Sequence, residues 1–90
     1  MPPPNRAARA DAPAPAPALT IDALGKKCPI PIIMLAERIR EVRVGQLVEV
    51  LADDPAAKTD LPAWCAIKSQ EFVQAAERPV GWSFLVRRSY

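Results

Sequence analysis

The sequence predicts a two-layer α/β sandwich, in which two helices cover one face of a four-stranded mixed sheet in the order β-α-β-α-β-β. Two observations support this fold class. Short apolar runs typical of strands alternate with stretches in which apolar residues recur at helical spacing. Glycine and proline residues separate these runs, and a chain of 90 residues has room for one domain.

The first half of this pattern predicts a β-α-β unit. Residues 19–24 alternate as a strand with one buried face does, and Gly25 ends the run. After Cys28 the apolar residues recur at helical spacing, at Ile32, Leu35, Ala36, Ile39 and Val42. Residues 47–51 form a second apolar run, which we expect to pair in parallel with the first through a right-handed crossover.

The second half predicts a helix followed by a hairpin. Thr59 or Asp60 is expected to cap the second helix, with Pro62 in its first turn, where a missing backbone N–H breaks no helical hydrogen bond. Two further strands are expected near residues 71–76 and 83–87, separated by a turn that contains proline and glycine. The order of the strands in the sheet does not follow from this pattern.

The composition changes abruptly near Leu19. Residues 1–18 contain six of the eleven prolines and show no hydrophobic periodicity. We therefore expect a disordered Pro/Ala-rich tail over residues 1–18 and a single domain over residues 19–90. A solubilising extension is favoured over a docking arm, because the tail carries no distinct recognition signal.

Several classes of protein are excluded by residue counts. The chain has no histidine, which rules out a Ser-His-Asp triad, a Cys-His pair and zinc sites that need imidazole. Two cysteines cannot supply a site with four thiolate ligands, so we expect neither a metal nor another cofactor. The sequence shows no signal peptide and no apolar run of membrane-spanning length. A monomer in the cytoplasm, with both cysteines as free thiols, is the expectation.

The charge of the domain argues against nucleic-acid binding. Residues 19–90 carry ten basic and nine acidic residues, which is close to balance. Proteins that bind nucleic acid directly present an excess of positive charge on one surface. We expect the aromatic residues to fill the small core, at Trp64, Phe72, Trp82 and Phe84.

The chemically informative stretch is Gly-Lys-Lys-Cys-Pro-Ile-Pro at residues 25–31. Pro29 is expected at the first helical position and Pro31 within the first turn, where proline removes no hydrogen bond. Cys28 then lies at or beside the helix N-cap, where the helix dipole favours a thiolate. Two lysines add positive charge to the same loop, Lys26 and Lys27. These features predict a reactive thiol, and the alternative is a small residue without a chemical role.

Two other groups of residues have competing interpretations. Asp53 and Asp54 follow the second strand as Cys28 follows the first, and the carboxyl ends of parallel strands share one edge of a sheet. The two carboxylates either steer a basic partner towards the thiol or terminate the strand and cap a turn, and the second role is favoured. Cys65 on the second helix is expected to be a structural core residue, with a resolving thiol for Cys28 as the alternative.

The run Leu24–Pro31 resembles the Cys-Pro-x-Pro signature of the TusA/SirA family of sulfur-carrier proteins. The likeness covers essentially all of residues 19–88, and further matching segments lie at residues 44–46, 53–55, 60–65 and 85–87. It implies a two-layer α/β sandwich whose signature cysteine, here Cys28, accepts sulfane sulfur and passes it to another protein. The sequence departs from close relatives of the tRNA-thiolation carrier at Ile30, where those proteins often have an acidic residue. We expect this departure to change partner recognition more than sulfur chemistry.

The resemblance implies a sulfurtransferase that carries sulfur as a persulfide on Cys28. Its partners would be a sulfur-donor protein, either a cysteine desulfurase or a rhodanese-like protein, and a sulfur-acceptor protein. The pathways open by analogy are tRNA thiolation, cofactor sulfuration and oxidation of reduced sulfur compounds. The alternative is a non-catalytic regulatory or partner-docking module on the same fold.

Overall fold

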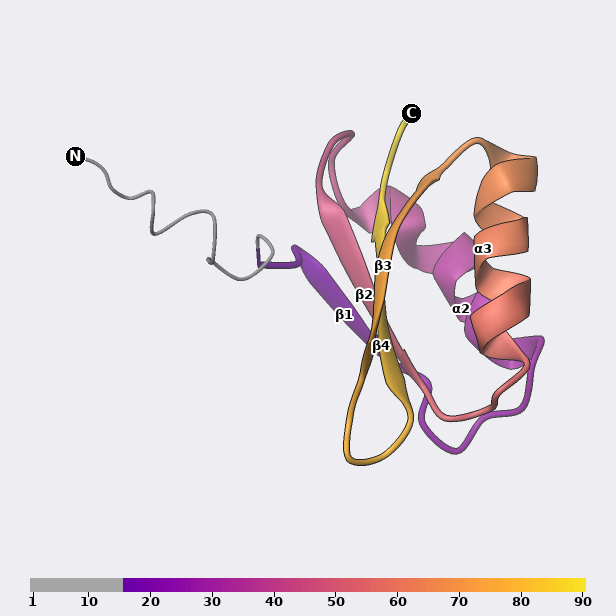
Figure 1. Ribbon diagram of the computed structural model, residues 1–90. Coiled ribbons are helices and arrows are strands. Elements are labelled where there is room, and N and C mark those ends of the chain that lie inside the picture. The colour runs from indigo at the N-terminus through magenta and orange to yellow at the C-terminus, as the bar shows by residue number, and fades with distance from the viewer. Residues whose placement is uncertain (1–15) are drawn as a thin grey trace.

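The chain forms the predicted two-layer sandwich, in which both helices cover one face of the sheet (Figure 1). A computed structural model describes residues 16–90, so the predicted tail lies outside the described residues over positions 1–15. The helices are α2 (Ile30–Arg38) and α3 (Ala57–Lys68), and the strands are β1 (Leu19–Asp22), β2 (Leu47–Ala52), β3 (Glu71–Glu77) and β4 (Trp82–Arg87). None of the helices within residues 16–90 combines the length and the apolar character that crossing a membrane requires.

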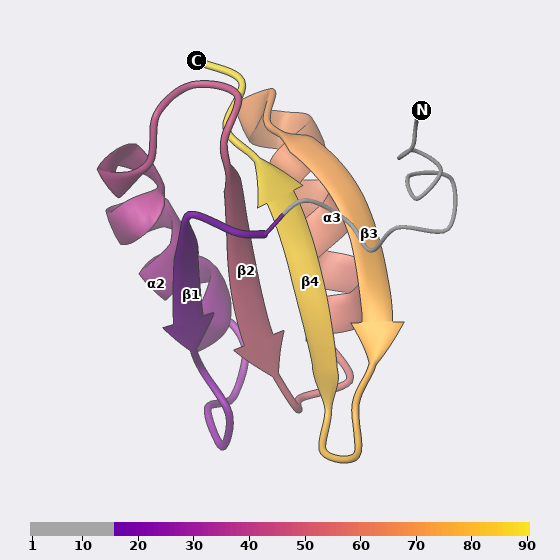
Figure 2. The ribbon, with the colours of Figure 1, turned by 90° about the vertical axis from the view of Figure 1, so that its left-hand side faces the viewer.

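The sheet has the strand order β1-β2-β4-β3 (Figure 2). β1 and β2 run parallel, as the β-α-β pattern predicts, whereas β4 is antiparallel to both of its neighbours. The predicted mixed sheet and element order are therefore confirmed. Since β1 and β2 are parallel neighbours, the loops that follow them leave the sheet at the same edge.

The core lies between the sheet and the two helices. Alternate residues of β2 and β4 face the helices in register, with Val48 opposite Val86 and Val50 opposite Phe84, and all four are fully buried. Leu35 from α2 and Leu61 from α3 close the core from the other side. Truncation of one such buried side chain to alanine typically costs about 2–5 kcal/mol of stability, so these contacts fix the helices on the sheet.

The start of α2 differs by one residue from the prediction. Pro29 precedes the helix, and Ile30 and Pro31 occupy its first two positions. As expected, neither proline costs a helical hydrogen bond, because the N–H groups at the start of a helix have no carbonyl partner within it. The helix gives way to a single 3-10 turn at Ile39–Glu41, which still buries Ile39 against the core.

The predicted cap of α3 is wrong. The helix begins at Ala57, upstream of Thr59 and Asp60, and the residue before it makes no side-chain capping bond. Asp54 takes over the role of a polar residue at this end, since its carboxylate accepts a hydrogen bond from the Ala56 N–H at 3.0 Å. Pro62 consequently lies in the second turn of α3 and not in the first.

The hairpin between β3 and β4 packs against the end of β2. Gly81 has a φ of +71°, a backbone conformation that side chains with a Cβ rarely adopt. A Cβ at this position would overlap the carbonyl oxygen of Ala52 and would lie 2.8 Å from the Cα atom of Asp53. Glycine therefore allows the hairpin to approach the first residue of the loop that follows β2.

Candidate functional site

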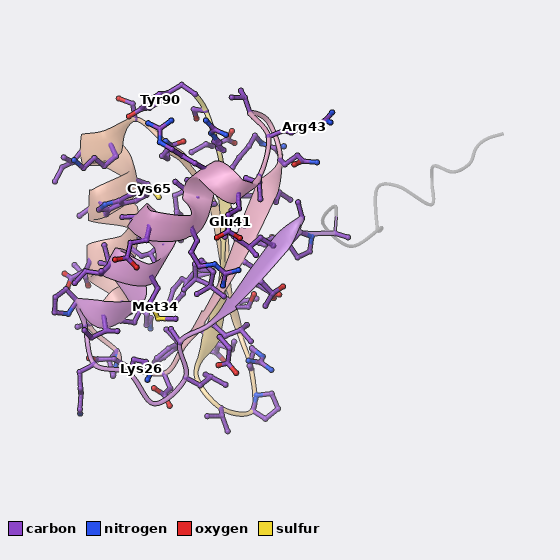
Figure 3. All side chains as sticks on the ribbon, turned by 180° about the vertical axis from the view of Figure 1, so that it is seen from behind. Lys26, Met34, Glu41, Arg43, Cys65 and Tyr90 are labelled. Atoms are coloured by element: carbon purple, nitrogen blue, oxygen red, sulfur yellow. The ribbon has the colours of Figure 1, made fainter. Side chains whose placement is uncertain are left out.

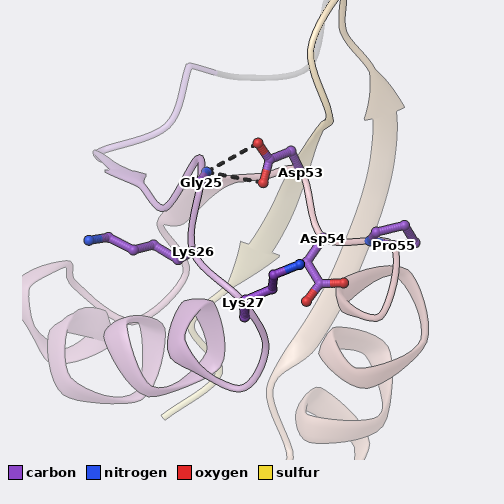
Figure 4. A pocket seen from close by; sticks show the side chains of 6 residues that line it. All are labelled: Gly25, Lys26, Lys27, Asp53, Asp54 and Pro55. Carbon is purple, nitrogen blue, oxygen red and sulfur yellow. Dashed lines mark hydrogen bonds between the residues drawn. The ribbon is translucent and has the colours of Figure 1, made fainter.

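Two loops meet at the carboxyl edge of the parallel strands (Figure 4). One loop follows β1 and carries Gly25, Lys26, Lys27 and Cys28, and the other follows β2 and carries Asp53 and Asp54. Between them lies an open pocket of about 320 Å³, lined by Gly25, Lys26, Lys27, Asp53, Asp54 and Pro55. The prediction that the carboxyl ends of the two strands bring these residues together is confirmed.

Both aspartates hold the backbone of the cysteine loop. The Gly25 N–H donates to the two carboxylate oxygens of Asp53 at 3.0 and 3.1 Å. The Cys28 N–H donates to Oδ2 of Asp54 at 2.8 Å, and Oδ1 of Asp54 accepts from the Ala56 N–H. The carboxylates therefore fix the cysteine loop on both sides of the lysines, and Asp54 also bonds the turn before α3, as the structural interpretation of this pair predicts.

Cys28 lies at the start of α2. It is the second residue before the first helical residue, Ile30, whose N–H donates to the Lys27 carbonyl oxygen at 2.8 Å. The side chain is half-buried and packs against the edge of the core, and the Cys28–Pro29 peptide bond is cis. Pro31 is buried in the first turn of α2, so it anchors the helix start and takes no direct part in the pocket.

The electrostatic environment of Cys28 differs from the prediction. Partial burial, followed by the negative charges of Asp54 and Asp60, raises the pKa of the Cys28 thiol above its ordinary value of 9.0. The sequence predicted the opposite direction, from the helix dipole and the two lysines. The loop geometry explains the difference, since the bond to the Cys28 N–H brings a carboxylate next to the thiol.

The two lysines are directed differently. Lys27 extends towards Asp54, while Lys26 points away from both carboxylates (Figure 4). The pKa of Asp54 is lowered from its ordinary value of 3.8, first by the hydrogen bond from the Cys28 N–H, then by that from Ala56 and by the charge of Lys27. Lys27 therefore compensates the charge of Asp54.

Cys65 has the structural role that the sequence favoured. It is 1% exposed, belongs to the core cluster, and is a free thiol, as Cys28 is. It lies along α3, away from Lys26 and the edge that carries the cysteine loop (Figure 3). Burial raises the pKa of the Cys65 thiol to about 11. Cys28 is therefore the more exposed of the two thiols.

Asp60 is a functional candidate that the sequence did not identify. It was expected only as a helix cap, whereas the structure places it in the first turns of α3, near enough to the thiol to raise the pKa of Cys28. The proximity arises because α2 and α3 both begin at the same edge of the sheet, which no local sequence pattern reveals. Within residues 16–90, no group of three potential ligand side chains is arranged to hold a metal ion.

Comparison with known proteins agrees with the fold. The family model described as "Sulfurtransferase TusA" matches residues 19–88, which is most of the chain. A similar solved structure is a SirA-like protein from Desulfitobacterium hafniense, with 28% sequence identity and a TM-score of 0.64. The match covers 77% of this chain and 93% of that protein. The chain therefore belongs to the TusA family of sulfurtransferases, a family of sulfur carriers that work with partner proteins.

Proposed function

We propose that the chain relays sulfur by carrying a sulfane sulfur atom as a persulfide on Cys28. The observation that carries this proposal is the contrast between the two thiols. Cys28 is half-buried in the loop at the carboxyl edge of the parallel strands, whereas Cys65 is enclosed in the core. A relay needs one accessible thiol in a fixed position, and two aspartates hold the backbone around Cys28.

The proposed chemistry is an exchange between thiols and persulfides. The Cys28 thiolate attacks the outer sulfur of a donor persulfide, a new S–S bond forms at Sγ, and the donor leaves as a thiolate that takes up a proton. In the second half, an acceptor thiolate attacks the outer sulfur of the Cys28 persulfide and Sγ leaves. Each half consumes one thiol and one persulfide and yields one of each, so no external oxidant or reductant is required.

This chemistry indicates the classes of protein that would act as donor and acceptor of sulfur. A cysteine desulfurase or a rhodanese-like protein carries a persulfide and suits the role of donor, and the acceptor is a protein with a reactive cysteine. A reducing cytoplasm suits the relay, because the thiols of the chain must stay free. Thiolation of tRNA, sulfuration of a cofactor and oxidation of reduced sulfur compounds all use such a carrier step, and donor specificity would distinguish between them.

One observation favours a second candidate, a docking module that does not carry sulfur. The pKa of Cys28 is raised by burial and by Asp54 and Asp60, which lowers the fraction of the nucleophilic thiolate. Under this alternative the Cys28 side chain would only shape a protein-binding surface. The two functions differ in whether the sulfur atom of Cys28 is required.

Sulfur loading of single-cysteine variants tests the proposal. Wild type, Cys28→Ser and Cys65→Ala are incubated with polysulfide, or with a cysteine desulfurase and cysteine, and weighed by intact-mass spectrometry. We expect wild type and Cys65→Ala to gain one sulfur atom that dithiothreitol removes, and Cys28→Ser to gain none. Equal loading of Cys28→Ser and wild type, or no loading of either, would refute the relay and leave the docking module.

A further inference from the structure

Apolar side chains stand exposed beside the reactive cysteine. Ile30 and Ile33 are 42% and 45% exposed, and they lie one turn apart at the start of α2, directly after the Cys28 loop. Their neighbours in the same helix, Pro31 and Leu35, are buried against the core. The two isoleucines therefore face away from the core, and an exposed apolar pair next to a reactive group is typical of a protein-binding surface.

An exposed negative charge lies near Cys28, in the first turn of α3. Asp60 is exposed on α3, and within residues 16–90 no cationic group lies within ion-pair distance of its carboxylate. Asp54 is already bonded to two backbone N–H groups and faces Lys27, whereas Asp60 has no such side-chain partner in the described part of the chain. Asp60 is therefore a carboxylate near the thiol that no cationic side chain of the described residues neutralises.

We propose that the docking face of this protein, formed by Ile30, Ile33 and Asp60 around Cys28, selects partners whose reactive cysteine is flanked by a basic and an apolar side chain. The inference rests on the proposed function for its biological meaning, since the partner is the donor or the acceptor of sulfur. The occupant is a protein segment, because an exposed apolar pair and a carboxylate unpaired within residues 16–90, all near one thiol, complement an apolar and a basic side chain of a partner.

A basic residue of the partner has a chemical effect as well as a binding effect. Asp54 and Asp60 disfavour the Cys28 thiolate, which is the attacking species in loading and the leaving group in transfer. A cation brought next to Asp60 offsets this repulsion and stabilises the thiolate in both steps. Docking of a basic partner thereby favours the Cys28 thiolate at the point where the partner binds.

Thiol–disulfide exchange with short peptides tests this selection without any sulfur loading. Each probe is a cysteine peptide activated as a mixed disulfide with thionitrobenzoate, and attack by Cys28 releases the coloured thiolate. The peptide cysteine is flanked by leucine and arginine, by leucine and glutamate, or by serine and arginine. Because every variant meets the same three peptides, the intrinsic reactivity of each probe cancels when a ratio of rates is compared between variants.

For wild type we expect the arginine–leucine peptide to react about tenfold faster than the glutamate–leucine peptide at low salt, and the ratio to shrink as salt screens the charges. Asp60→Asn should reduce this ratio several-fold. Glu37→Gln is the matched control, because it removes one exposed carboxylate about 10 Å further along α2 and should leave the ratio unchanged.

The apolar part of the face has its own variants. A double variant, Ile30→Ser with Ile33→Ser, should reduce the preference for leucine over serine peptides several-fold. Ile67→Ser is the control, since this side chain is 78% exposed near the far end of α3. Unchanged ratios in Asp60→Asn and in the double isoleucine variant would overturn the docking face, whatever the outcome of sulfur loading. Failure of Cys28 to load sulfur, with these ratios as expected, would instead refute the relay and retain the face.

Discussion

The two thiols of this chain should differ in reactivity by about a hundredfold or more. Burial raises the pKa of Cys65 to about 11 from an ordinary value of 9.0, which lowers its thiolate fraction at neutral pH by about a hundredfold relative to an ordinary thiol. The raised pKa of Cys28 offsets part of this difference between the two thiols. A reagent must also reach a side chain that is 1% exposed, so it depends on local opening of α3. Opening that costs about 3–5 kcal/mol would by itself slow alkylation by about two to four orders of magnitude.

Alkylation by iodoacetamide measures this difference directly. Cys65→Ala reports on Cys28 and Cys28→Ser reports on Cys65, with the extent of labelling followed over time by mass spectrometry. In concentrated urea both thiols are exposed, and the two rates should converge to within about threefold. If Cys65 in the folded protein were labelled within about tenfold of the rate of Cys28, the assignment of Cys65 to the core and of Cys28 to the accessible edge would be refuted.

Three further predictions concern the loops around Cys28. Gly81→Ala forces a residue with a Cβ to adopt a positive φ and to overlap the end of β2, and it should cost about 2–4 kcal/mol in urea denaturation; a loss below about 0.5 kcal/mol would contradict the close approach. The pKa of Asp54 is lowered below 3.8 by its bonds to the Cys28 and Ala56 N–H groups, so its stabilising effect is present above that pH and is lost as the pH falls through its folded-state value. The free energy of unfolding should therefore fall more steeply in acid for wild type than for Asp54→Asn, and parallel curves would argue against these bonds. The pKa of Cys28 should lie above 9.0 in Cys65→Ala, as followed by thiolate absorbance, and Asp54→Asn should lower it; a midpoint below 9.0 would show that the helix dipole and the lysines prevail.

The alternation of strands and helices could be predicted from the sequence because its causes are local. The helical spacing of Leu35 and Ile39 and the apolar run of β2 reflect which side chains face the core, and the structure buries them as expected. The meeting of Cys28 with Asp53 and Asp54 also followed from a general rule, since parallel strands end at one edge of the sheet. These conclusions needed no knowledge of side-chain orientation.

The two predictions that were wrong, the cap of α3 and the direction of the pKa shift at Cys28, depend on how side chains are oriented in the fold. The cap of α3 was assigned to Thr59 or Asp60, the polar residues nearest the apolar run, whereas Asp54 reaches across the turn and lets the helix begin at Ala57. The direction of the pKa shift at Cys28 was wrong for a similar reason. The sequence shows that lysines adjoin the cysteine, but only the fold shows that a carboxylate bonds to its N–H.

Because the pKa of Cys28 is raised, the reactivity of this thiol would depend partly on the charge of the protein that docks beside it. A raised pKa lowers the fraction of Cys28 present as thiolate, which is the species that exchanges sulfur. Under the proposed relay, a partner that places a cation near Asp60 would favour the thiolate where transfer is intended.

Localisation and chase of the carried sulfur test the central claim most directly. The protein is loaded with polysulfide, freed of excess reagent, and divided into a sample for peptide mapping and a sample treated with an acceptor thiol. The account predicts one additional sulfur atom on the peptide that contains Cys28, none on the peptide that contains Cys65, and its stoichiometric appearance on the acceptor as a persulfide. Sulfur found on Cys65, or sulfur on Cys28 that no acceptor thiol removes, would contradict a relay through Cys28.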